Sequence, residues 1–506
     1  CFAWSSLSLD PGDDQPVEAR TSRALELGVH AFLALTQAII ARKCEADARL
    51  HYLYFGTPDA AEPHAVTVEF SAERAEIAAK AALDDALSTH GPRHWDVAYG
   101  CSGSVGAIAD TLLLAGRIGG EIGVSQNLGG GDKAAAQGYA QEAARISLIL
   151  GGLYGLVLLT LAGPLISLMQ VREADVFQGA SDYLRIAGIG IPFTYLSAAI
   201  TGSFNGAGNS RLGFWANATG LVVNMILDPV MILAWGWGIR GAAIATVIAQ
   251  AIVCTLLVYY ARRHPSRPFD RFRVLGRFCR ARIRQILAWS LPVMLESGVF
   301  TALAMVVTGM VSSIYGANAV AVQRVGSQIE SISWLIGGGF SSAVAAFVGQ
   351  NYGARKWARI RRGYRISLAA MLSYMFLVML LLVFGGRFLF SLFLREPPEL
   401  LSMGGEYLLI LAGCQLFMAL EGTCAGTFRG MGKTLPPSIA SITSNLIRPL
   451  LCWALAQRMG LNGFWLGITL SAALRGTMMF VWFSLFQRRM PHEDGQPAPA
   501  LDLPAA

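Results

Sequence analysis

The feature that most constrains this chain is a series of long apolar stretches. Residues Ile146–Met169, Phe214–Trp235 and Ile366–Phe393 each approach or exceed the roughly 20 residues that cross a bilayer as a helix. Backbone polar groups find no water in lipid, so such segments must pair their N–H and C=O groups internally, as a helix does. Only 14% of the 506 residues are charged, whereas a soluble chain carries about a quarter. The sequence therefore predicts an all-α polytopic membrane protein.

The loops between the apolar stretches alternate in charge. Residues 262–284 hold nine Arg and one Asp, and residues 355–365 hold six Lys or Arg and no acid. By the positive-inside rule these loops face the cytoplasm, with the C-terminus on the same side, as in a multi-pass protein of the inner (plasma) membrane. The position of the basic residues in these loops is explained by the orientation of the protein in the membrane, so we expect no nucleic-acid partner. About eleven spans are predicted, at 98–125, 145–169, 183–206, 212–235, 239–261, 286–314, 318–348, 366–393, 404–428, 436–457 and 461–487.

An internal repeat organises these spans. "VSQNLGG" from Val124 matches "VGQNYGA" from Val348, and "FNGAGNS" from Phe204 matches "FRGMGKT" from Phe428, both at one and the same sequence offset. The glycines let the chain turn at a helix end, and the Gln-Asn pairs can bond carbonyl groups that the helix end leaves free. Because an even number of spans separates the copies, both halves have the same orientation, which is typical of pseudo-symmetric transporters.

The pattern resembles the multidrug and toxic compound extrusion (MATE) transporters. The phrases that carry the resemblance are "AAFVGQNYGARKWARI", "SFNGAGNSRLGFWANATGLVVNMILDPVMI", "GAAIATVIAQ" and "TFRGMGKTLPPSI". The resemblance implies two pseudo-symmetric six-helix bundles. It also implies export of small organic, often cationic, compounds driven by Na⁺ or H⁺.

One part of the chain departs from the family pattern. The repeat places a first helix near residues 62–90, but this stretch is charged, and each charge at mid-membrane costs about 2.5–3.5 kcal/mol. We expect the first family helix to be missing or replaced, with a short strand at 64–70 and a helix at 72–87. The expected organisation is an atypical N-terminal segment 1–97, an N-terminal lobe 98–261, a basic linker 262–285, a C-terminal lobe 286–487 and a cytoplasmic tail 488–506.

Asp228 is the strongest candidate for chemistry because it lies inside an apolar helix, where an ionisable residue indicates function by default. Asn224 is one turn earlier on the same face, and Pro229 removes a backbone donor, which leaves the carbonyl of Met225 without its helical partner. Such oxygen atoms suit Na⁺, and burial can equally favour a proton on the carboxylate. The resemblance adds Thr246 to this cation site. A helix-kinking Asp-Pro with structural bonds is the alternative.

The C-terminal half offers further candidates. Glu296 follows Pro292 by one turn and is expected to couple the cation or to be a buried, hydrogen-bonded acid. Glu421 and Arg448 lie inside helices, so each is expected in an ion pair, mutual or with a nearby group, and the alternative is that they contact substrate in the cavity. Glu330 and Trp334 are expected near the substrate cavity, with Trp334 able to stack on an organic cation.

No Walker, GxSxG or HExxH motif is present, so neither an enzyme nor an ATP-driven pump is expected. The expected protein is a monomeric antiporter that works by alternating access, with no cofactor beyond its coupling ion. A flippase for lipid-linked oligosaccharides of similar architecture is one alternative. The other is a membrane protein that does not transport because its first helix is absent.

Overall fold

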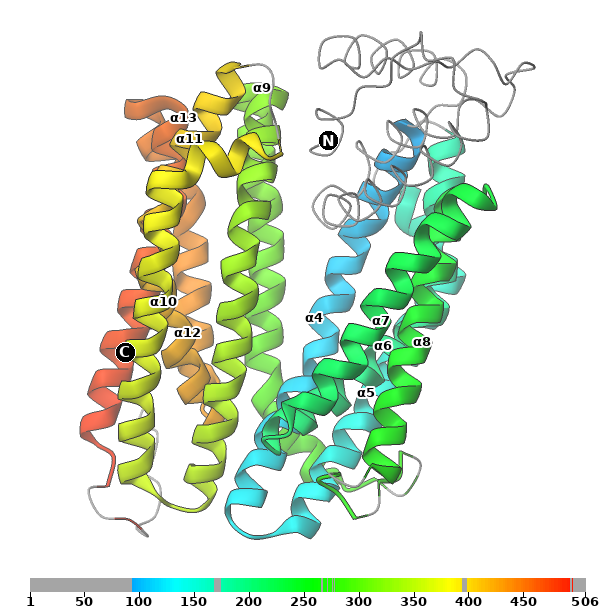
Figure 1. The fold of residues 1–506 in the computed structure, drawn as a ribbon, viewed down its shortest axis with the longest axis vertical. Helices are drawn as coiled ribbons and strands as arrows, with labels where there is room; N and C mark the ends of the chain where they lie inside the picture. Colours follow the sequence, from blue (N-terminus) through cyan, green and yellow to red (C-terminus); the bar gives the residue numbers. More distant parts are fainter. Residues whose placement is uncertain are drawn as a thin grey trace, which may run out of the picture. The chain divides into compact units, whose positions relative to one another are not determined.

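The computed structural model describes residues 93–167, 174–264, 267–270, 272–274, 276, 278–393, 398–491 and 494. No residue in these ranges lies in a β-strand, so the prediction of an all-α fold is confirmed. The strand and helix expected at 64–70 and 72–87 lie outside the described residues. The helices are α4 (Arg93–Gly129), α5 (Lys133–Ser167), α6 (Ala174–Gly206), α7 (Ser210–Pro229), the π-helix η2 (Val230–Ala234), α8 (Gly238–Arg263), α9 (Arg280–Gly353), α10 (Trp357–Ser391), α11 (Pro398–Ala412), α12 (Gln415–Gly430) and α13 (Leu435–Arg488) (Figure 1).

Two of these helices are interrupted by glycine. In α9 the chain leaves helical geometry at Gly316 (φ 79°, ψ −172°), and in α13 it does so at Gly460 (φ 60°, ψ −139°). Glycine adopts such positive φ angles without steric cost. Helices α9 and α13 therefore each contain two of the predicted spans. With the bent pair α11 and α12 taken as one span, the described chain carries the helical segments that the sequence predicted.

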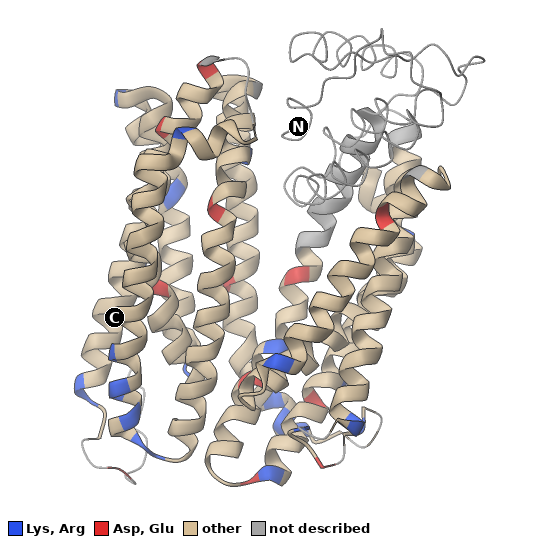
Figure 2. Cartoon of the chain, in the orientation of Figure 1, with Lys and Arg blue, Asp and Glu red and all other residues tan. Residues whose placement is uncertain are grey.

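Length and composition support a membrane-spanning fold. Eight helices of the described chain are long and apolar enough to cross a bilayer, or nine when the bent pair Glu399–Ala412 and Gln415–Gly430 counts as one span. Helix α4, which carries Asp110, Arg117 and Glu121, is not among them, although its sequence was predicted to span. Phe384 is 84% exposed and Leu335 is 80% exposed, as expected of side chains that face lipid. Figure 2 shows that the middle parts of the C-terminal helices carry few charged residues.

The contacts divide the chain into two compact units. The larger unit comprises Ala107–Leu156, Ile189–Leu221 and Ile248–Ala506, and so includes all of α9 to α13. The smaller unit comprises Val157–Gly188, Val222–Val247 and the described residues of α4 up to Gly106. Below, the N-terminal half means α4 to α8 and the C-terminal half means α9 to α13.

The sequence repeat is also a repeat of packing. On α6, a Cβ at Gly202 or Gly206 would overlap the backbone oxygen of Arg117 or Glu121 of α4. The equivalent glycines of α12, at the same offset in the repeat, would overlap Ser341 and Ala345 of α9. Small residues four apart let two membrane helices approach this closely. The same helix contact is therefore built twice, once in each half.

Candidate functional site

The first candidate site lies where α7 ends. Asn224 donates from Nδ2 to Oδ1 of Asp228 at 3.1 Å, and both side chains are half-buried. The α-helix stops at Pro229, which has no backbone N–H, and the chain continues as a π-helical turn in which the Trp235 N–H bonds the Val230 oxygen at 3.0 Å. Asn224 and Asp228 therefore share one face of the helix, as their spacing predicts. π-Helical turns of this kind often accompany functional sites.

Thr246 lies on α8, in the same compact unit as Asp228. Its hydroxyl donates to the Ala242 oxygen of its own helix at 2.9 Å, which leaves the lone pairs of Oγ1 as acceptors. A carboxylate, an amide oxygen and a hydroxyl oxygen are donors that a hard cation accepts. Among the described residues no three His, Cys, Asp or Glu side chains gather as a metal site.

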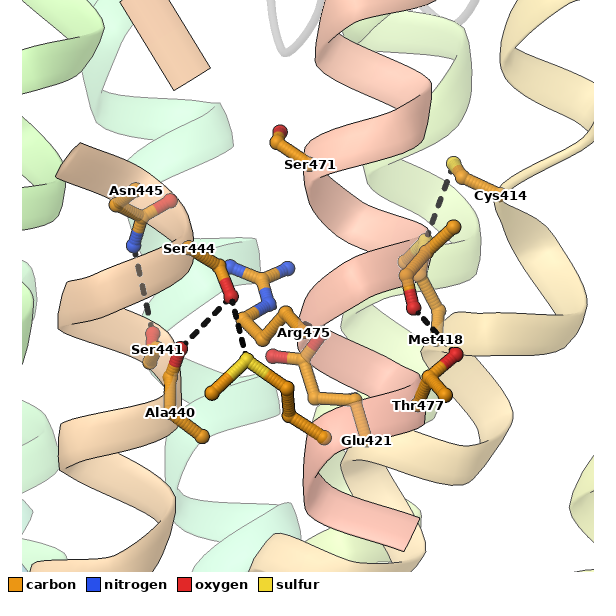
Figure 3. A network of polar contacts seen from close by, with 12 residues as sticks. Cys414, Met418, Glu421, Ala440, Ser441, Ser444, Asn445, Ser471, Arg475 and Thr477 are labelled. Carbon is orange, nitrogen blue, oxygen red and sulfur yellow. Dashed lines mark hydrogen bonds and ion pairs between the residues drawn. The ribbon is translucent and has the colours of Figure 1, made fainter. Parts of the chain in front are cut away.

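Glu296 of α9 meets a polar face of α13. Ser438 donates to Oε2 of Glu296 at 2.9 Å, and further along the same face Asn445 donates to the hydroxyl of Ser441 at 3.4 Å. These α13 residues are spaced three and four apart, which places them on one side of the helix. The amide oxygen of Asn445 is buried and accepts no hydrogen bond from the described residues (Figure 3). A buried acceptor of this kind is uncommon in proteins, and it lies along the face that contacts Glu296.

Glu421 forms its ion pair with a residue that the sequence analysis did not single out. Arg475 of α13 contacts Oε2 of Glu421 of α12 through Nε at 2.7 Å (Figure 3). The mutual pair of Glu421 with Arg448 was one of the two arrangements expected, and the structure shows the other. Arg448 instead donates from Nε to Ser471 at 2.8 Å, and its guanidinium lies 5.7 Å from the centre of the Phe300 ring.

Glu330 and Trp334 lie one turn apart on α9 and differ in exposure. Glu330 is buried, and its Oε1 accepts from Gln415 Nε2 at 3.3 Å. Trp334 is 42% exposed, and its ring centre lies 6.4 Å from that of Phe300. Phe300 therefore lies within reach of both Trp334 and the Arg448 guanidinium, an arrangement of aromatic and cationic groups that the sequence did not reveal.

Arg475 could have been found by the rule that singled out Asp228. It stands in the apolar stretch "ITLSAALRGTMMFVWF", where an ionisable residue indicates a function or a partner. Ser438 and Gln415 had no comparable signal, because serine and glutamine are common in helices and only the fold brings them to Glu296 and Glu330.

Comparison with known proteins identifies the family of this chain. The MatE family model matches residues 98–230 and 292–454, in both halves of the chain and in more than half of its length. This chain belongs to the MatE family. Its members are transporters, so the chain is a multi-pass membrane protein of a multidrug efflux family, with small molecules as substrates.

Individual MatE relatives agree over most of the chain. It is 25% identical over 399 residues to NorM of Thermotoga maritima, a probable multidrug resistance protein, covering 76% of this chain and 83% of NorM. It is 27% identical over 351 residues to YoeA of Bacillus subtilis, also a probable multidrug resistance protein, covering 66% of this chain and 73% of YoeA.

Solved MATE structures share the fold. A crystal structure of a MATE transporter in its straight conformation aligns with a TM-score of 0.73 at 20% identity, over 78% of this chain and 88% of that one. An outward-facing MATE transporter of the MOP superfamily aligns equally well, with a TM-score of 0.73 at 20% identity over 78% of this chain and 88% of that one. The predicted family and its architecture of two pseudo-symmetric helical bundles are confirmed.

Proposed function

We propose that this MatE protein is a cation-coupled antiporter that exports small organic, often cationic, compounds by alternating access. It acts as a monomer in the inner membrane with its C-terminus in the cytoplasm. Asp228 and Glu296 are the carboxylates that exchange the coupling ion, Na⁺ or H⁺. The names of its relatives, which speak of multidrug resistance, support small organic compounds as substrates.

The observation that carries the proposal is the geometry at Asp228. A carboxylate stands at the break between α7 and η2 in an otherwise apolar helix, and the Asn224 amide orients it through a 3.1 Å hydrogen bond. Since Asn224 donates through its nitrogen, its oxygen remains an acceptor, and together with Thr246 it supplies neutral ligands for Na⁺. When H⁺ is the coupling ion, the carboxylate alone carries it.

Glu296 is the second carboxylate of the proposal and lies in the C-terminal half. Its contact with the hydroxyl of Ser438 fixes one carboxylate oxygen, and the polar face of α13 provides further oxygen atoms. A bound ion shifts a conformational equilibrium only through different affinities for the two states. A carboxylate that loses or gains its charge in a half-buried setting supplies such a difference, because the cost of burying the charge depends on how much water reaches it.

The proposal predicts that Asp228→Asn abolishes coupled transport while the protein still folds in the membrane. The amide keeps the shape of the side chain but can neither carry a proton nor neutralise a cation. The measurement is transport of a fluorescent organic cation into inverted vesicles, with an imposed Na⁺ gradient, an imposed pH gradient or neither. We expect the gradient-driven rate to fall at least tenfold.

The matched control is Asp182→Asn. Asp182 lies in the same compact unit and accepts a hydrogen bond from Arg240 Nε at 3.0 Å, and the proposal gives it no part in carrying the ion, so this variant should keep the wild-type rate. Full gradient-driven transport by Asp228→Asn would remove Asp228 from the mechanism. Transport of a lipid-linked sugar in place of the cation would support the flippase instead, and no transport of either by the wild-type protein would support the non-transporting alternative.

A further inference from the structure

The repeated Gln-Asn phrases make hydrogen bonds between the two halves. Gln126 at the end of α4 donates from Nε2 to the backbone oxygen of Gly430 at the end of α12, at 2.9 Å. Gln350 at the end of α9 donates from Nε2 to the backbone oxygen of Gly206 at the end of α6, at 3.0 Å. The donors are equivalent positions of the repeat and so are the acceptors, so the two bonds are the same contact made in opposite directions. All four residues belong to the larger compact unit.

The backbones around these bonds are in direct contact. A Cβ on Gly129 would overlap the backbone oxygen of Gln350, and a Cβ on Gly353 would overlap that of Gln126. Glycine at both positions is therefore what allows the ends of α4 and α9 to touch. A third contact lies beside them: Ser342 of α9 donates to Oε1 of the buried Glu121 of α4 at 2.6 Å.

Each glutamine amide also lies against a turn of the opposite half. Gly208 and Gly432 have φ angles of 78° and 72°, and they close equivalent turns after α6 and α12. Gln350 Nε2 lies 3.2 Å from the place a Cβ of Gly208 would take, and Gln126 Nε2 lies 3.0 Å from that of Gly432. A side chain at either glycine would displace the opposing amide. The turn glycine and the glutamine therefore fit one another across the halves.

The neighbouring asparagines do not take part. Asn127 donates from Nδ2 to the Gly123 oxygen at 2.7 Å, and Asn351 donates to the Phe347 oxygen at 2.8 Å, each within its own helix. Both residue types bond carbonyl groups at helix ends, the asparagines in their own helix and the glutamines in a helix of the other half. Within one phrase, the asparagine finishes the helix and the glutamine reaches the other half.

We propose that Gln126 and Gln350, with Gly430 and Gly206, form a reciprocal latch that closes the transporter on the face of its basic loops. The inference rests on the proposed alternating-access function, in which the two halves must separate at this face once in each cycle. Because the two bonds are equivalent, opening breaks both together. The glutamines are positioning residues: they set the population of the closed state and touch neither substrate nor coupling ion.

The test is hydrogen exchange by mass spectrometry on the full protein in lipid nanodiscs, with Gln126→Ala and Gln350→Ala made singly and together. A net hydrogen bond is worth about 0.5–1.5 kcal/mol, so each single variant should speed amide exchange about three- to tenfold. The increase should appear at both turns, 204–209 and 428–433, including the turn that the altered glutamine does not contact. The double variant should exceed either single variant.

Asn127→Ala and Asn351→Ala are the matched controls, since they remove an amide of similar size from the same phrases. They should change exchange only in their own helix ends. Faster exchange confined to the turn that lost its own bond, or an equal effect in the controls, would overturn the latch. Gln126→Asn, which keeps the amide but is one methylene too short to reach Gly430, provides the same test if an alanine variant does not fold.

The readout does not depend on transport. Should Asp228→Asn leave coupled transport intact, the proposed coupling site would be wrong, whereas faster exchange at both turns in the glutamine variants would still establish the latch. Conversely, unchanged exchange in those variants together with loss of transport in Asp228→Asn would reject the latch alone.

Discussion

At one turn position, the two copies of the repeat differ in the free energy that the left-handed backbone conformation costs. It is occupied by Gly131 (φ 84°) after α4 and by Arg355 (φ 53°) at the equivalent place after α9. A left-handed conformation costs a non-glycine residue about 1–2 kcal/mol, partly offset because glycine loses more chain entropy on folding. We predict that Gly131→Ala lowers the stability by about 1 kcal/mol, and that Arg355→Gly is more stable than Arg355→Ala by a similar amount.

The alanine variant at 355 is the reference because it removes the arginine side chain and its contacts while keeping the strained backbone. Thermal unfolding in one detergent, followed by the fluorescence of a thiol-reactive dye at buried cysteines, measures all four proteins. Equal melting temperatures for Arg355→Ala and Arg355→Gly would mean that the turn relaxes and that no strain is stored there.

The part of the candidate site that could be predicted from sequence is the part where an ionisable residue lies in an apolar helix. Asp228 stands out in an apolar helix, and Asn224 shares its face by helical spacing alone, so their contact was foreseeable. The partner of Glu421 was not, because helical spacing relates residues within one helix, whereas Arg475 lies on another helix 54 positions later. Which of two arginines meets a glutamate depends on how α12 and α13 pack.

At the scale of helices, glycine spacing sets which pairs come close. A Cβ at Gly426 would lie 2.5 Å from the backbone oxygen of Ser341, whereas Gly422, one turn earlier on α12, has open space. We predict that Gly426→Ala destabilises the protein by about 1–3 kcal/mol, the usual cost of overpacking. Gly422→Ala should be neutral or slightly stabilising, because alanine favours a helix by up to about 1 kcal/mol.

The same unfolding assay compares the two variants, and Gly202→Ala on α6 should behave like Gly426→Ala because it meets Arg117 in the equivalent place. Near-identical stability of Gly426→Ala and Gly422→Ala would show that α9 and α12 can move apart at no cost.

Helix positions followed from apolar length, and their ends followed from glycine turns. The predicted spans 318–348 and 461–487 correspond to the second parts of α9 and α13, after Gly316 and Gly460. The π-helical form of η2 was not predictable, because Pro229 dictates that a backbone bond is lost but not how the next turn compensates. The charged face of α4 likewise needed the fold: Glu121 is explained by Ser342 of the other half, which no local pattern indicates.

At the scale of the whole molecule, the repeat predicted two like halves but not the contact between them. The sequence shows that Gln126 and Gln350 occupy equivalent positions of the repeat. Two equivalent glutamines that each bond only within their own helix would give the same sequence pattern. The crossed bonds to Gly430 and Gly206 exist because the halves meet at these helix ends. This contact depends on tertiary structure, and a sequence pattern within one half does not predict it.

Orientation in the membrane gives the last prediction, and the lysines allow it to be measured. The described lysines Lys133, Lys356 and Lys433 all lie at helix ends or in turns on the side that the basic loops assign to the cytoplasm. A membrane-impermeant acylating reagent should therefore modify them in inverted vesicles and leave them unmodified in intact cells, as read by mass spectrometry of the peptides. Burial lowers the pKa of Lys433 to about 8. Since a lowered pKa means that the reactive neutral amine predominates above that value, modification of Lys433 in inverted vesicles should be half-maximal near pH 8. Modification in intact cells would reverse the orientation and with it the direction of the proposed export, while lysed cells, in which all three lysines should react, provide the control for access of the reagent.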